Sequence, residues 1–163
     1  MAGTKTTFTS FLESVPQDQH GFVMKLHEYM LNNNCAVGIK EAKNGYVASY
    51  THITDKRVTA NYVFRKKGLI MRLYADNIQQ YADYLQELPQ DLKNDIASAP
   101  PCKRMIDPGA CNPRCLQGFD FFLNGARHQK CRNSCFMILV AEKNNRFLEN
   151  LVRHELKQRN LRV

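Results

Sequence analysis

The cysteines of this chain are gathered in one short segment. Five of the six lie between Cys102 and Cys135, and four form Cys-x3-Cys pairs, Cys111 with Cys115 and Cys131 with Cys135. The N-terminal residues lack the apolar core of a secretory signal, so the cytosol is the expected compartment. Thiols stay reduced there, and clustered cysteines indicate metal or redox chemistry more than a disulfide framework.

An Asn124-Gly125 step lies between the two cysteine pairs, flanked by strand-like runs. Asn-Gly is the strongest short-range hairpin signal, because both turn residues must adopt a positive φ. The sequence therefore predicts a two-residue turn and an antiparallel hairpin. This turn pairs Leu123 with Ala126, Phe121 with His128, and Gly118 with Cys131.

The predicted hairpin brings Cys131 close to the turn-rich loop that carries Cys111 and Cys115. We therefore predict a tetrahedral zinc site, with Zn²⁺ held by Cys102, Cys111, Cys115 and Cys131 and with Cys135 as the substitute ligand. Three intervening residues are allowed for paired zinc ligands but are not diagnostic. Such a closed site would be structural rather than catalytic.

Three other interpretations of the cysteine segment stay open. In the first, the thiols are reduced core residues. In the second they are the reactive groups of a redox protein, and in the third the ligands of an iron–sulfur cluster. His128 is not expected to activate Cys131, because residues three apart on a strand point to opposite faces.

The net charge of the chain is +8, and its sequence pI is about 9.3. A basic balance favours acidic partners, so nucleic acid or an anionic ligand is a candidate partner. The densest cationic run lies near residues 153–162, where a solvated helix face explains it equally well. No apolar run approaches the roughly 18 residues of a membrane span, so no membrane partner is expected.

Hydrophobic periodicity predicts the order of the elements. Helical spacing is expected over residues 17–31, 76–88, 90–97 and 144–159, and period-2 strands over 36–42, 46–52, 58–65, 69–74, 119–123, 126–131 and 135–141. Residues 1–10 are polar and are expected to carry no stable element.

This order indicates an α+β fold with an antiparallel sheet, made of a four-strand meander and three further strands. N-terminal, central and C-terminal helices should pack with the sheet. Pro100-Pro101 suggests two pieces, a meander region over 1–99 and a cysteine-rich hairpin subdomain over 100–163, unless these form one continuous domain. The expected core comprises Phe22, Leu26, Val58, Tyr62, Phe64, Tyr81, Leu85, Phe136, Ile138, Leu151 and Val152.

The motifs of nucleotide-binding loops, serine hydrolases and zinc proteases are absent from the sequence, which gives no reason to expect an enzyme. We expect a small cytosolic binding or regulatory domain with a structural zinc site. The alternatives are a nucleic-acid-binding protein that uses the basic cysteine-rich region, and a thiol-based redox or iron–sulfur protein.

Overall fold

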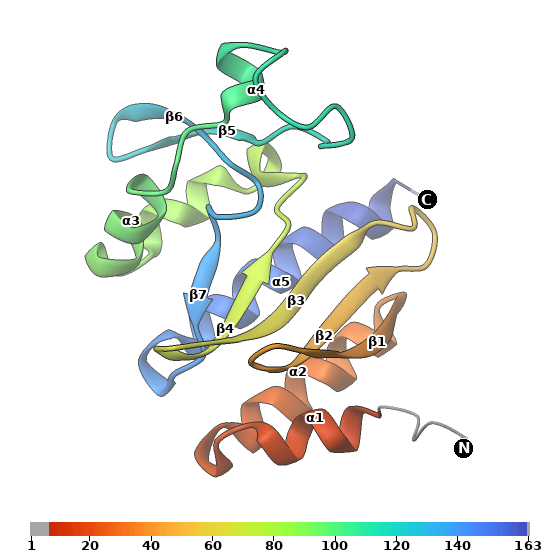
Figure 1. The fold of residues 1–163 in the computed structure, drawn as a ribbon. Coiled ribbons are helices and arrows are strands. Elements are labelled where there is room, and N and C mark those ends of the chain that lie inside the picture. The colour runs from red at the N-terminus through yellow and green to blue at the C-terminus, as the bar shows by residue number, and fades with distance from the viewer. Residues whose placement is uncertain (1–6, 163) are drawn as a thin grey trace. The chain divides into compact units, whose positions relative to one another are not determined.

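The computed structural model describes residues 7–162 (Figure 1). The described residues form two compact units, one from residues 7–73 with residues 138–162 and the other from Tyr74–Met137. The α+β class predicted from the sequence is confirmed. The expected division into a meander region over 1–99 and a cysteine-rich subdomain over 100–163 stays a prediction.

The larger sheet contains the predicted meander. Its strand order is β1-β2-β3-β4-β7, with β1 at Cys35–Ala42, β2 at Gly45–His52, β3 at Val58–Arg65, β4 at Gly68–Leu73 and β7 at Met137–Leu139. The first four strands pair antiparallel in sequence order, as short turns require. Each of their bounds lies within one residue of the expected one.

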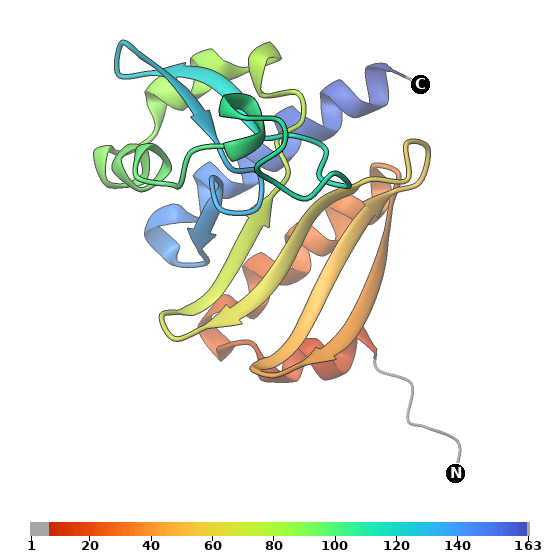
Figure 2. The ribbon, with the colours of Figure 1, turned by 45° about the horizontal axis from the view of Figure 1, so that its top comes forward.

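Three helices pack on one face of this sheet, namely α1 (Phe8–Ser14), α2 (His20–Asn32) and α5 (Glu142–Leu161). Figure 2 shows α1 and α2, in red and orange, behind strands β1 to β4. The ring of Phe11 in α1 stacks on Tyr62 with their centroids 5.5 Å apart. The hydroxyl of Tyr50 forms a 2.8 Å hydrogen bond with Nδ1 of His27 in α2. Tyr50 and Tyr62 also meet edge to face, so this face of the sheet holds the aromatic core.

Helix α1 corrects the expectation that residues 1–10 carry no stable element. Thr7 caps it by accepting a hydrogen bond from the Ser10 backbone N–H at 3.4 Å. Phe11 is fully buried, and Val15, just after the helix, is 4% exposed. Residues 1–6 lie outside the described part of the chain.

The second unit contains short helical turns and a two-stranded sheet. The turns are η2 (Ile78–Gln80), η3 (Ala82–Glu87), α3 (Gln90–Ala97) and α4 (Lys103–Ile106), and the strands are β5 (Phe119–Leu123) and β6 (Ala126–Lys130). The helix expected over 76–88 is two 3-10 turns instead. Tyr81 between them has φ −138° and ψ 22°, which no helix accommodates. Helix α3 has the predicted bounds.

Most of the expected core is buried. Among its eleven positions, Phe22, Val58 and Phe64 are partly exposed and the rest are buried. The strand expected over 135–141 is shorter, because Cys135 donates its backbone N–H to the Cys131 carbonyl and so belongs to a turn. Only Met137–Leu139 is extended enough to pair with the sheet.

Candidate functional site

The hairpin predicted from Asn124-Gly125 is confirmed. Asn124 has φ 53° and Gly125 has φ 75°, the two positive values that this turn requires. The strands pair Leu123 with Ala126 and Phe121 with His128, in the predicted register. The imidazole of His128 stacks on the ring of Phe121, where it stabilises the hairpin.

Cys102 is buried beside this hairpin. Its backbone N–H donates to the Gln129 carbonyl at 2.9 Å, and the Cys131 N–H donates to the Pro100 carbonyl at 2.9 Å. Residues 100–102 therefore run along the end of β6, bringing the segments of two predicted ligands side by side. The Gly118 N–H donates to Cys102 Sγ at 3.2 Å, so the sulfur accepts a hydrogen bond from the backbone.

Cys111 and Cys115 lie in the loop that follows α4. Cys111 is exposed and Cys115 is partly exposed, and a turn at Asn112 joins them. Over residues 7–162, no group of three or more Cys, His, Asp or Glu side chains is arranged to hold a metal ion. The structure thus places two of the predicted ligands on neighbouring segments and does not assemble the set of four, so zinc binding stays a prediction.

The remaining thiols are buried. Cys135 is 3% exposed, and burial raises the pKa of its thiol far above the ordinary value. Cys35 in β1 is also 3% exposed, and its pKa is raised chiefly by burial. Both stay protonated at neutral pH, which makes them core residues rather than nucleophiles. All six cysteines are free thiols.

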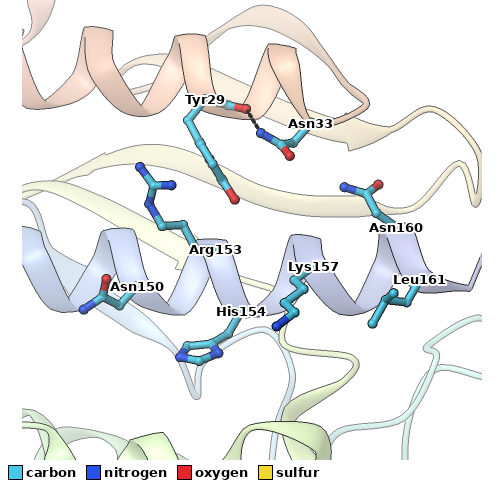
Figure 3. Close-up of a pocket in the computed structure, with 8 residues that line it drawn as sticks. All are labelled: Tyr29, Asn33, Asn150, Arg153, His154, Lys157, Asn160 and Leu161. Carbon is cyan, nitrogen blue, oxygen red and sulfur yellow. Dashed lines mark hydrogen bonds between the residues drawn. The ribbon is translucent and has the colours of Figure 1, made fainter.

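A groove between helices α2 and α5 was not predicted from the sequence. It has a volume of about 590 Å³, and Figure 3 shows the side chains that line it: Tyr29, Asn33, Asn150, Arg153, His154, Lys157, Asn160 and Leu161. The lining includes Arg153, Lys157 and His154 and no carboxylate. The cations of α5 were visible in the sequence, but only the packing of α2 against α5 reveals that they line a groove.

Arg153 is held at one wall of this groove. Its guanidinium lies 4.1 Å from the centroid of the Tyr29 ring and donates two hydrogen bonds to Glu149, at 3.1 and 2.8 Å. Lys25 pairs with the same carboxylate at 3.2 Å. Burial alone would raise the pKa of Glu149, but the hydrogen bonds from Arg153 and Lys25 hold it below its ordinary value. Two cations thus share one anion, and the wall keeps a net positive charge.

Two asparagine amides lie at the other end of the groove. Asn33 Nδ2 donates to the Tyr29 carbonyl at 2.8 Å, so Asn33 Oδ1 is the atom turned toward the groove (Figure 3). Asn160 Oδ1 lies 2.8 Å from His52 Nε2 and 3.0 Å from Asn34 Nδ2. The Asn160 Nδ2 group is left facing the groove.

A buried ion pair stabilises the helix that carries this wall. Arg159 is 3% exposed and donates through Nε to Glu155, which is fully buried, at 2.8 Å. Its Nη1 donates to the Arg57 carbonyl at 3.2 Å. The last turns of α5 are therefore anchored to the β2–β3 turn, and the groove is built on rigid elements.

No family model, curated protein or solved structure matches this chain. None of the helices described for residues 7–162 is long and apolar enough to cross a membrane. The chemistry of the two candidate sites is therefore what indicates a function.

Proposed function

We propose that this protein is a nucleic-acid-binding module that takes phosphate groups into the groove between α2 and α5. The observation that supports the proposal is the lining of the groove, which presents Arg153, Lys157 and His154 and no carboxylate. Cations from one rigid helix are the usual way to neutralise a phosphate backbone. The net charge of +8 strengthens the attraction.

Lys157 is the cation best placed to bind a phosphate. Its side chain is exposed, and within residues 7–162 it forms no hydrogen bond or ion pair. Arg153 is already paired with Glu149, so it contributes a fixed guanidinium at the wall. A phosphate in the groove would meet one available ammonium group and one guanidinium held in place by Tyr29.

Binding of a fluorescent single-stranded RNA 12-mer, measured by anisotropy at several salt concentrations, tests the proposal. We expect the logarithm of the association constant to fall linearly with the logarithm of the salt concentration. Lys157→Ala should weaken binding and reduce the slope by about 0.7, the value for one phosphate contact on a single strand.

Lys67→Ala is the matched control, because Lys67 is an exposed lysine in the β3–β4 turn, outside the groove. It removes the same charge and should leave most of the affinity. Inorganic polyphosphate serves as a base-free polyanion in the same assay. The proposal is wrong if neither polyanion binds at low salt, or if Lys67→Ala weakens binding as much as Lys157→Ala does.

The proposed setting is the cytosol, where the six free thiols would stay reduced. A structural zinc ion on Cys102, Cys111, Cys115 and Cys131 is proposed as a separate property of the second unit. The hydrogen bond from Gly118 N–H to Cys102 Sγ supports it, because such bonds stabilise thiolate ligands.

A further inference from the structure

We infer that the groove between α2 and α5 binds a nucleotide whose base is unpaired, with the base at the Asn33–Asn160 end. The inference rests on the proposed function and adds the chemical class of the ligand. A phosphate requires only cations. The amides at the opposite end supply what a base edge needs, a hydrogen-bond acceptor beside a donor.

The orientation of the Asn33 amide follows from its one internal hydrogen bond. The Tyr29 carbonyl accepts only, so the Asn33 atom 2.8 Å from it is the donor Nδ2. Asn33 Oδ1 forms no hydrogen bond within the described residues 7–162. It therefore offers a fixed acceptor to the groove.

The orientation of the Asn160 amide follows from its contact with Asn34. Asn34 Nδ2 donates to the Asn160 atom 3.0 Å away, so that atom is the acceptor Oδ1. The same Oδ1 lies 2.8 Å from Nε2 of the buried His52. Asn160 Nδ2 forms no hydrogen bond in the described part of the chain and offers its two N–H donors to the groove.

Every nucleobase carries a donor next to an acceptor on its Watson–Crick edge, so this amide pair complements a base edge. In a duplex that edge is already paired, which restricts the site to an unpaired base. The groove volume of about 590 Å³ is within the usual range of small-molecule sites. Lys157 lines the groove one turn before Asn160 on α5, and Figure 3 shows its side chain extending away from α2.

A comparison of two 12-mers with equal numbers of phosphates tests the inference, one with bases and one abasic. We expect the oligomer with bases to bind at least about tenfold more tightly. Asn160→Asp keeps the oxygen that His52 requires and replaces the donor with an acceptor. It should reduce this ratio to about one.

Asn150→Asp is the matched control, because it adds the same negative charge to the groove without altering the Asn33–Asn160 pair. It should weaken both oligomers equally and preserve the ratio. Uridine 5′-monophosphate distinguishes the source of the nucleotide: tight binding of this monomer indicates a free nucleotide, and tight binding of the 12-mer alone indicates a strand. Either result supports base recognition.

A second measurement uses the unaltered protein, in case Asn160→Asp does not fold. The side-chain amide resonances of Asn160 should shift in NMR spectra when uridine 5′-monophosphate is added and stay in place with ribose 5-phosphate. Equal binding of the two 12-mers, with no such shift, overturns the inference and leaves the proposed function standing. Failure of polyphosphate and of both 12-mers to bind overturns both.

Discussion

The backbone at position 118 approaches its neighbours so closely that only glycine fits. A Cβ placed there would lie 2.1 Å from the Lys130 carbonyl oxygen and 2.8 Å from Cys102 Cβ. The same close approach lets the Gly118 N–H reach Cys102 Sγ. The absence of a side chain at position 118 therefore allows the Cys102 segment to pack against the hairpin.

Gly118→Ala should destabilise the protein by at least about 1–3 kcal/mol, the cost of overpacking against groups that cannot move aside. Gly21→Ala is the control, because a Cβ at that helical position meets nothing within 4 Å. It should stabilise the protein by up to about 1 kcal/mol. Urea denaturation of the three proteins measures both changes, and equal midpoints for Gly118→Ala and the unaltered chain would contradict the prediction.

At this scale, the sequence predicts local contacts and misses distant ones. The pairing of Phe121 with His128 could be predicted from Asn124-Gly125, because a two-residue turn sets the register of the two strands. The contact between Cys102 and Gly118 has no local signal, since it depends on the Pro101–Lys130 bridge between distant segments. The orientation of the Asn160 amide in α5 likewise depends on distant residues, Asn34 and His52.

Helix α1 shows how a short element depends on its packing. Its seven residues are too few for stability in isolation, so the buried ring of Phe11 must hold it against β3. Phe11 contacts both Tyr62 and Phe64, with centroids 5.5 and 5.8 Å apart. The apolar spacing of Phe8, Phe11 and Val15 is the signal that would have predicted this helix.

Phe11→Ala should cost about 3–5 kcal/mol, because it leaves a cavity among aromatic rings. Phe122→Ala, at a position that is 64% exposed, is the control and should change stability by less than about 1 kcal/mol. Thermal unfolding followed by circular dichroism compares them. A Phe11→Ala melting temperature close to that of Phe122→Ala would show that α1 contributes little to the core.

Elements with a strong period and clear turn residues could be predicted, and those set by tertiary contacts could not. The meander has Asn44-Gly45 and Gly68 at two of its turns and alternating apolar residues, so its strands were predicted to within one residue. The 76–88 segment has helical spacing but adopts two 3-10 turns around Tyr81. Tyr81 is 5% exposed, so its tertiary packing overrides the local period.

At the scale of the whole molecule, the metal content of the protein tests the predicted zinc site. If it does, untagged protein should contain one zinc per chain by elemental analysis, and chelation should release it. Without metal, Cys111 is exposed and should react with iodoacetamide while Cys35 and Cys135 stay protected. Zinc should then slow the alkylation of Cys111 and Cys115.

Cys115→Ser should abolish stoichiometric zinc and destabilise the region after Pro101 more than the meander. Cys35→Ser is the control, because Cys35 lies in β1 and belongs to the other unit. Absence of metal, together with alkylation of Cys111 at the same rate with and without zinc, would leave the cysteines as ordinary thiols.

The division of the chain into units has a consequence for its synthesis. One unit is continuous, Tyr74–Met137, whereas the other combines residues up to Leu73 with those from Ile138 onward. On the ribosome, β1 to β4 emerge long before α5, whose Asn160 and Arg159 anchor the β2–β3 turn. The continuous unit, Tyr74–Met137, can fold before α5 has been synthesised, whereas the meander cannot yet pack against that helix. A ribosome paused before α5 would therefore leave exposed the part of the apolar sheet face that α5 covers, which makes the nascent chain a substrate for chaperones at that point.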